Sequence, residues 1–191
     1  MKILVTPDPK LREKSKKVNK ITPEIREIVD TMIKANLEWE KEHPYELSAA
    51  MAAPQMGFMK RIIVIRDDMD NKENTSYTAL IDPEVIKTEG RIEKDYEGCL
   101  SVPTIYGLVP RPDKARIKAK LIDGTEVRIK SKGPLTRTLL HEIDHLEGVL
   151  FIDYIKDDKD AWFELDKKGD IVKIDYEKRI KNNKELFPDE D

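Results

Sequence analysis

The sequence predicts an α+β fold in which small antiparallel or mixed β-sheets pack around one central helix. Segments with strand character gather before this helix instead of alternating with helices, which favours α+β over a parallel α/β sheet. The helix is expected at residues 135–148, and its apolar positions follow the spacing of a buried stripe: Leu135, Leu139, Ile143 and Leu146. A chain of 191 residues suits a single domain over residues 1–191. Residues 156–191 are expected to be a polar C-terminal extension, whose structure the pattern does not define.

The N-terminal part of the chain is predicted to contain one long helix. After an extended start and a Pro-Asp-Pro turn, Thr22 has the character of a helix N-cap and Pro23 that of a first helical residue. Apolar residues continue at helical spacing, so we expect this helix to end near Glu42. Residues 48–57 are a run of small residues, which allows either a tightly packed turn or the close approach of another backbone.

The middle of the chain is predicted to form strands. Residues 61–66 are the apolar run of a buried strand, and a polar loop follows at residues 67–74. Three short strands, separated by Pro83 and by Glu89-Gly90, are expected next: residues 76–81, 84–87 and 91–96. Residues 115–122 and 125–130 alternate on either side of Asp123-Gly124, which is a strong signal for a hairpin with a two-residue turn.

The segments after the central helix are less regular. Residues 149–155 are apolar and are expected to pack beside that helix. Further along, Ile171, Val172 and Ile174 favour a strand, and residues 176–186 favour a helix. The chain closes with an acidic segment at residues 187–191.

Composition and charge exclude several classes of protein. Hydrophobic residues make up 39% of the chain and charged residues 38%, which describes a folded, soluble protein. No apolar run approaches the roughly 20 residues that span a bilayer, so no membrane partner is expected. The net charge of -3, with both signs interspersed, argues against direct binding of nucleic acid. The start lacks a signal or transit segment and Cys99 is the single cysteine, so we expect a cytoplasmic protein without disulfides.

The central helix carries the residues with the clearest chemistry. His141 and His145 are four residues apart and lie on one side of a helix, so both can bind one ion and the helix is a metal-binding helix. Glu142 stands beside them and can reach a water on that ion, which is the arrangement of metal-assisted hydrolysis. The pattern His-Glu-x-x-His also occurs by chance on solvated helices. Against chance, two of only three histidines have ligand spacing, and Gly133-Pro134 and Gly148 are suitable helix ends.

Two histidines leave a catalytic metal site short of a ligand, because such sites usually take three from the protein. Position 151, where one class of protease has its third histidine, is Phe151. Glu164 lies near the distance at which a second class of protease places a glutamate. Cys99 is the remaining soft ligand, although a lone cysteine is more often a buried small hydrophobe. The residues alone therefore leave Cys99 and Glu164 open as the third ligand.

Cys99 lies in a segment that resembles a known family. Three segments are similar to the peptide deformylase (polypeptide deformylase) family, in the family's own order. Residues 48–55 resemble its motif Gly-x-Gly-x-Ala-Ala-x-Gln, residues 97–101 are identical to Glu-Gly-Cys-Leu-Ser, and residues 141–145 match His-Glu-x-Asp-His. The resemblance runs from about residue 3 to residue 155, and the combination of the three motifs is highly specific.

The resemblance implies a hydrolase that removes the N-formyl group from the N-terminal methionine of newly synthesised polypeptides. Its cofactor would be one Fe2+ bound by Cys99, His141 and His145, for which Ni2+, Co2+ or Zn2+ can substitute. Glu142 would act as the acid and base of the reaction.

The family also implies how the substrate is held. Gln55 and the backbone N–H of Leu100 would stabilise the oxyanion of the reaction. The formyl-methionyl peptide would add as a strand beside the substrate-binding residues, which are Ser48, Ala49, Ala50, Glu97, Gly98 and Tyr106.

Departures from the family pattern fall in the substrate-binding part of the site. Ser48 and Ala50 replace the two motif glycines, Tyr106 replaces an arginine that many members carry, and Leu140 stands where glutamine is common. These changes bear on substrate preference more than on the chemistry. Some members contact the ribosome through a basic C-terminal helix, and the acidic end of this chain argues against that contact.

Two other functions remain as alternatives. A zinc endopeptidase would use Glu164 as its third ligand, and would keep its metal and its activity in the variant Cys99→Ser. A non-catalytic descendant of the family would bind formylated or nascent peptides, an idea that the two lost glycines motivate. Glu142 and Gln55 argue against this second alternative, because a protein that only binds peptides needs no general base.

Overall fold

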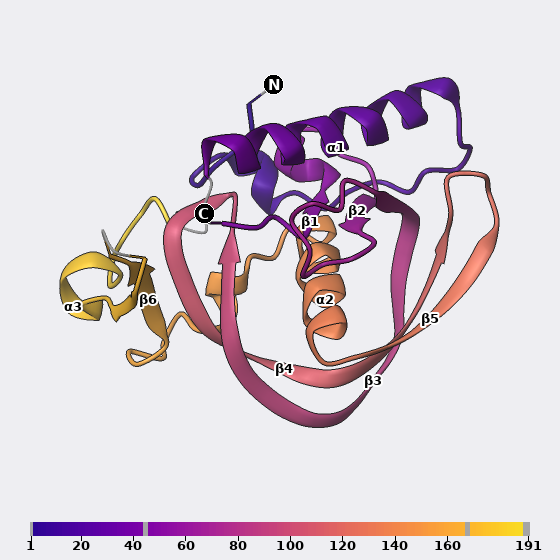
Figure 1. Cartoon of the computed structure of the whole chain (residues 1–191). Helices are drawn as coiled ribbons and strands as arrows, with labels where there is room; N and C mark the ends of the chain where they lie inside the picture. The colour runs from indigo at the N-terminus through magenta and orange to yellow at the C-terminus, as the bar shows by residue number, and fades with distance from the viewer. Residues whose placement is uncertain (1, 44–45, 167–168, 189–191) are drawn as a thin grey trace.

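The computed structural model describes residues 2–43, 46–166 and 169–188. Residues 189–191, which belong to the predicted acidic end, lie outside the described residues. Figure 1 shows helix α2 (Pro134–Leu146) at the centre, enclosed by a strongly curved sheet, with the long helix α1 (Pro23–Glu42) lying across the opposite side. This arrangement confirms the predicted α+β fold around a central helix.

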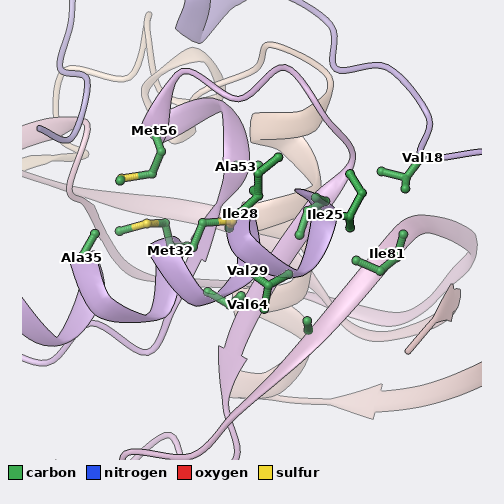
Figure 2. Close-up of a cluster of buried hydrophobic side chains, with 13 residues drawn as sticks. Val18, Ile25, Ile28, Val29, Met32, Ala35, Ala53, Met56, Val64 and Ile81 are labelled. Carbon is green, nitrogen blue, oxygen red and sulfur yellow. The ribbon is translucent and has the colours of Figure 1, made fainter. Parts of the chain in front are cut away.

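Helix α1 has the predicted bounds. Thr22 occupies its N-cap position, Pro23 is its first residue and Glu42 its last. Its apolar face packs against β1 (Ala50–Ala52), the 3₁₀ helix η2 (Ala53–Met56) and β2 (Ile62–Arg66). Figure 2 shows this buried cluster, in which side chains of α1 meet Val64 of β2. The cluster fixes α1 against the segment that leads into β1.

In the part of the chain that the structure describes, seven strands join into one antiparallel sheet. Their order is β1-β2-β3-β4-β6-β7, and β5 also pairs with β4. The strands that follow β2 are β3 (Tyr77–Cys99), β4 (Val102–Lys120), β5 (Glu126–Lys132), β6 (Trp162–Leu165) and β7 (Ile171–Lys173). Over the described residues, the small sheets expected from the sequence are therefore parts of one continuous sheet.

The prediction of three short strands between residues 76 and 96 is wrong, because residues 77–96 all lie within the single strand β3. The pairing of β3 with β4 shifts register between Ile81 and Glu84 and between Glu89 and Ile92. Asp82 and Gly90 have positive φ angles of 51° and 85° at these shifts. The residues that signal strand ends are thus sites of irregular pairing that bend the strand. The bends let β3 and β4 curve around α2 (Figure 1).

The sequence pattern gives no indication of β4 before residue 115. Proline is unfavourable in a strand because it cannot donate to the ladder, yet Pro110 and Pro112 pair opposite Lys94 and Ile92. The hairpin around Asp123-Gly124 is confirmed, with β4 and β5 paired on either side of it. The expected two-residue turn is wrong, because the N–H of Leu121 donates to the carbonyl of Thr125 at 2.9 Å and three residues, 122–124, form the connection. Gly124 has a φ of 94°, a conformation that glycine adopts without strain.

Helix α2 buries the predicted apolar stripe. Its residues pack against β2, β3 and β4, with Leu135 at the edge of the cluster and the other three members buried: Leu139, Ile143 and Leu146. Gly148, with a φ of 76°, reverses the chain after the helix. A Cβ atom at this position would lie 2.4 Å from the backbone oxygen of Arg12, so the turn requires glycine.

The C-terminal extension is folded onto the body of the molecule. Beside α2, residues 149–155 include the 3₁₀ helix η3 (Phe151–Tyr154), and a third apolar cluster joins η3 and β4 to Trp162, Ile174 and Leu186. The predicted helix at residues 176–186 is wrong beyond Arg179, where α3 (Tyr176–Arg179) ends. Asn182 has a φ of 62°, which a helix does not permit.

A 3₁₀ helix, η1 (Pro9–Arg12), follows the extended N-terminal segment. No helix in the described part of the chain is long and apolar enough to cross a membrane.

Candidate active site

Three potential metal ligands meet where the sheet contacts α2. Cys99 is the last residue of β3, and His141 and His145 project from successive turns of α2. Their ligand atoms all lie within 4.8 Å of one another, and Cys99 Sγ is 3.2 Å from His145 Nε2. Ligand atoms of a tetrahedral site lie roughly 3.5 Å apart, so small side-chain movements suffice for these three to bind one ion. Thiolate and imidazole suit Fe2+, Zn2+, Co2+ or Ni2+ better than Mg2+ or Ca2+.

The structure brings Cys99, and not Glu164, to the two histidines. Glu164 lies in β6, where its Oε2 accepts a hydrogen bond from Arg179 Nη1 at 2.5 Å. It is absent from the one group of potential ligands found among the described residues. The residues alone left the third metal ligand open, and the geometry therefore favours the thiolate of Cys99 over the carboxylate of Glu164.

A buried carboxylate orients His141. The Nδ1–H of His141 donates to Glu97 Oε2 at 2.9 Å, which leaves the lone pair of Nε2 for a metal. Glu97 also accepts hydrogen bonds from Arg111 Nε at 2.6 Å and from Arg137 Nη1 at 2.7 Å. Burial opposes ionisation of Glu97, but the hydrogen bonds from His141 and Arg111 hold its pKa well below the usual range. Glu97 is thus a stable anion that fixes the tautomer and the ring orientation of His141.

Glu142 is a buried carboxyl group next to the ligands. It lies on α2 between the two histidines and lines the same cavity as Cys99. Its Oε2 is buried and has no hydrogen-bond partner among the described residues. Burial raises the pKa of Glu142 to about 7, where a carboxyl group can both accept and release a proton near neutral pH.

Gln55 points its amide nitrogen toward Cys99. Its Oε1 accepts the backbone N–H of Ala52 at 2.8 Å, which fixes the orientation of the amide. Its Nε2 lies 3.2 Å from Ser101 Oγ and 3.6 Å from Cys99 Sγ. Leu100 follows Cys99 and lines the same cavity. Amide N–H groups at these two positions can donate to an oxygen atom bound near Cys99.

Residues 48–50 form one wall of the site and are held in place by α1. The backbone N–H of Ser48 donates to Glu40 Oε1 at 2.8 Å, and its carbonyl accepts from Asn36 Nδ2 at 3.4 Å. Glu40 is itself paired with the buried guanidinium of Arg66 at 2.6 Å. The hydroxyl of Ser48, which replaces a motif glycine, lies 3.4 Å from the carbonyl of Ala50 in its own segment.

Tyr106 bridges the cavity. Its hydroxyl donates to Glu46 Oε2 at 2.6 Å, which links β4 to the segment that precedes residues 48–50. Burial, followed by the contact with Glu46, raises the pKa of Tyr106 above its ordinary value, so the hydroxyl stays protonated. Its ring covers Gly98, where a Cβ atom would lie 2.6 Å from a ring carbon. The replacement of the family's arginine thus places an uncharged ring and a hydroxyl at this part of the cavity.

The cavity has a volume of about 640 Å³ and gathers the predicted site residues. Apart from His145, all of them line it: Ser48, Ala49, Ala50, Gln55, Glu97, Gly98, Cys99, Leu100, Tyr106, His141 and Glu142. Sequence reasoning missed Arg137, whose spacing of four residues before His141 on one helix face was an available signal. It also missed Leu165 and Ile171, which line the cavity from the C-terminal extension and belong to no motif.

The chain is similar to known proteins over most of its length. A family model described as polypeptide deformylase matches residues 1–161. A peptide deformylase of Thermomicrobium roseum is 39% identical over 81% of this chain and 85% of that protein. One of Halothermothrix orenii is 43% identical over 78% of this chain and 88% of that protein. A crystal structure of a peptide deformylase from Synechococcus elongatus in complex with actinonin has a TM-score of 0.70 and 32% identity, covering 81% of this chain and 78% of the other.

The matched range contains the whole cluster described above. Residues 1–161 include the three potential metal ligands, which are Cys99, His141 and His145. They also include the buried Glu142 and Gln55, whose amide nitrogen is directed at Cys99. The chain is therefore an enzyme of the polypeptide deformylase family, whose members are metal-dependent hydrolases that act on N-formyl peptides.

Proposed function

We propose that this chain removes the N-formyl group from the N-terminal methionine of newly synthesised polypeptides, with one Fe2+ bound by Cys99, His141 and His145. Ni2+, Co2+ or Zn2+ can replace Fe2+, because thiolate and imidazole accept each of them. The enzyme would work in the cytoplasm, where its free Cys99 stays reduced. Residues 1–191 would act as one domain, since β6 pairs with β4 and shares an apolar cluster with it.

One observation carries this proposal: a buried carboxyl oxygen of Glu142, which has no hydrogen-bond partner in the described part of the chain, stands beside a group of three potential metal ligands. An unpaired buried polar atom costs about 1–3 kcal/mol, so a carboxylate with only a structural role would be expected to have a partner. Glu142 lines the cavity in which a water and a substrate can be accommodated. These facts support Glu142 as the general base and acid.

The residues of the cavity would provide the steps of formamide hydrolysis. When bound, the metal ion supplies Lewis acidity, which lowers the pKa of a water and polarises a carbonyl group. Glu142 would take a proton from the attacking water while the water oxygen bonds to the formyl carbon. Gln55 Nε2 and the N–H of Leu100 would donate to the oxygen that gains charge, a contribution of about 3 kcal/mol per donor in other enzymes. Glu142 would then pass its proton to the leaving nitrogen as the C–N bond breaks, giving formate and a free amine.

The peptide would lie as an added strand along residues 48–50. On one side, β1 pairs with β2, where Ala50 lies opposite Ile65, while Ser48, Ala49 and Ala50 line the cavity. A strand added to this segment would be held by backbone hydrogen bonds, which depend little on the side chains of the peptide. This manner of binding suits an enzyme that acts on many different new polypeptides.

The test is formate release from formyl-Met-Ala-Ser by protein purified without oxygen and loaded with Fe2+ or Ni2+. We expect turnover that falls by about 100- to 10,000-fold in Glu142→Ala while the metal stays bound. Cys99→Ser should lose both metal and activity. The matched control is Glu164→Gln, which alters a carboxylate of β6 that pairs with Arg179 and should keep both.

Two outcomes would overturn the proposal in different ways. Metal retained in Cys99→Ser but lost in Glu164→Gln would identify the zinc endopeptidase instead. Wild-type protein with one metal per chain but without formate release would identify a protein that only binds peptides.

A further inference from the structure

The cavity receives part of its wall from residues that lie beyond the family match. The match ends at residue 161, whereas Leu165 of β6 and Ile171 of β7 line the same cavity as Cys99 and Glu142. This part of the wall therefore lies outside the range that the family model matches.

Strand pairing puts these residues on the cavity side of the sheet. Gly98 lies opposite Tyr106, and Tyr106 lies opposite Phe163 of β6. Because side chains two residues apart share a face, Leu165 is on the same face as Phe163, and Ile171 lies directly opposite Leu165. Tyr96 shares this face from β3, and its ring meets that of Phe163 edge-on with centroids 5.0 Å apart. The sheet thus presents a continuous apolar surface that leads away from Cys99.

The strand pair β6 and β7 is firmly anchored behind this surface. Trp162 is fully buried, and Ile174 and Leu186 are 3% and 4% exposed in the third apolar cluster. Arg12 Nη2 also donates to the carbonyl of Leu186 at 3.1 Å, which ties the extension to the N-terminal segment. Leu165 therefore follows a buried anchor in β6, and Ile171 is held beside it through the pairing of β7 with β6.

Two side chains of this apolar surface, Ile171 and Tyr96, are exposed to solvent. Ile171 is 44% exposed and Tyr96 is 42% exposed, although both line the cavity. Apolar side chains that remain exposed in a cavity next to reactive groups are typical of a surface that contacts a ligand. Strands lie about 4.8 Å apart, so β7 is roughly 14 Å from β3, a distance that an extended peptide covers in about four residues.

We propose that Leu165 and Ile171, together with Tyr96, form a subsite for an apolar side chain of the formyl peptide, two to four residues after the methionine. The subsite rests on the proposed function, because its occupant is the substrate of that reaction. Continuity with the cavity of Cys99 favours the substrate over a separate partner protein as the occupant.

The experiment compares peptides that reach the subsite with a peptide that ends before it. The substrates are formyl-Met-Ala, as the short reference, and a series formyl-Met-Ala-Xaa-Xaa-Xaa in which leucine or alanine occupies each of the last three positions in turn. Each kcat/KM is first divided by that of the short reference, formyl-Met-Ala. For the wild-type enzyme we expect this normalised kcat/KM to be about three- to tenfold higher with leucine than with alanine at one of the three positions. The gain should appear in KM. In Leu165→Ala/Ile171→Ala the leucine-to-alanine ratio should fall to about one.

Two further variants keep the test independent of folding. Val172→Ala removes an apolar side chain of similar exposure from the opposite face of β7 and should keep the wild-type ratio. Ile171→Asp should shift the preference at the same position from leucine to lysine, a gain that a damaged protein cannot show. A ratio near one in the wild type, or an equal ratio in all variants, would overturn the subsite. Absence of turnover with formyl-Met-Ala itself would overturn the proposed function instead.

Discussion

One wall of the cavity rests on buried charges, whereas the other rests on buried apolar side chains. Residues 48–50 are tied to α1 through Asn36 and Glu40, and Glu40 pairs with the fully buried Arg66. The pair β6 and β7 is tied to the body through an apolar cluster around Trp162. Buried charges permit one geometry and fail together when a partner is removed, whereas apolar contacts tolerate exchange. Residues 48–50, which are proposed to hold the reacting end of the peptide, thus depend on contacts that tolerate substitution less well than those of β6 and β7.

The largest effect should come from breaking the charged support. Glu40→Ala would leave Arg66 buried without its carboxylate and the N–H of Ser48 without its acceptor. We expect the free energy of unfolding to fall by about 3–5 kcal/mol in urea titration. Glu38→Ala is the matched control, because this exposed glutamate of α1 lies 3.9 Å from Lys34 and should change the free energy by less than about 0.5 kcal/mol. Similar small losses in both variants would show that the buried pair does not support this wall.

Truncation of the apolar support should have a somewhat smaller and more local effect. Ile174→Ala would remove a buried side chain of the third apolar cluster and lower the free energy of unfolding by about 3 kcal/mol. Amide hydrogen exchange should accelerate in β6 and β7 and remain slow in β1, because the two walls have separate supports. Val172→Ala, at an exposed position two residues away, serves as the control. Equal acceleration in both walls would contradict their independence.

The smallest effect should follow from cutting the hydrogen bond that links β4, the strand on which β6 pairs, to the segment before residues 48–50. Tyr106→Phe removes the hydrogen bond to Glu46 but keeps the ring over Gly98. Because Tyr106 is only partly buried, we expect a loss of about 1 kcal/mol in the free energy of unfolding. Tyr96→Phe removes a hydroxyl from the same face of the sheet and should leave the free energy unchanged. A loss in Tyr96→Phe as large as that in Tyr106→Phe would argue against a specific role of the link.

The chemistry-bearing part of the site was predictable because it depends on short-range spacing. A helix fixes the separation of His141 and His145, and the same periodicity predicts the stripe that buries the other face of α2. Cys99 was not accessible in this way, since residue spacing left Glu164 equally open and only the family resemblance favoured the cysteine. Long-range strand pairing, and not any local rule, brings Cys99 to the helix.

The parts that the sequence did not predict depend on tertiary context. Pro83 and Gly90 signal strand ends, but the pairing partner β4 keeps β3 continuous across both. Ile171 reads as one member of a short strand, and nothing local shows that register with Leu165 turns it toward the cavity. The predicted helix at residues 176–186 fails for the same reason, because Ile180 and Leu186 are buried by contacts with distant strands and not by helical periodicity.

The position of Cys99 next to α2 affects the stability of the folded protein as well as its reaction. An ion shared by Cys99 and His141 would join two points about 42 residues apart in the chain, as a reversible cross-link between a strand and a helix. Since the unfolded chain does not hold these atoms together, the ion would stabilise the folded form by about 2.7 kcal/mol when its free concentration is 100 times its dissociation constant. A cell short of metal would then hold less of this protein, and not merely a less active one.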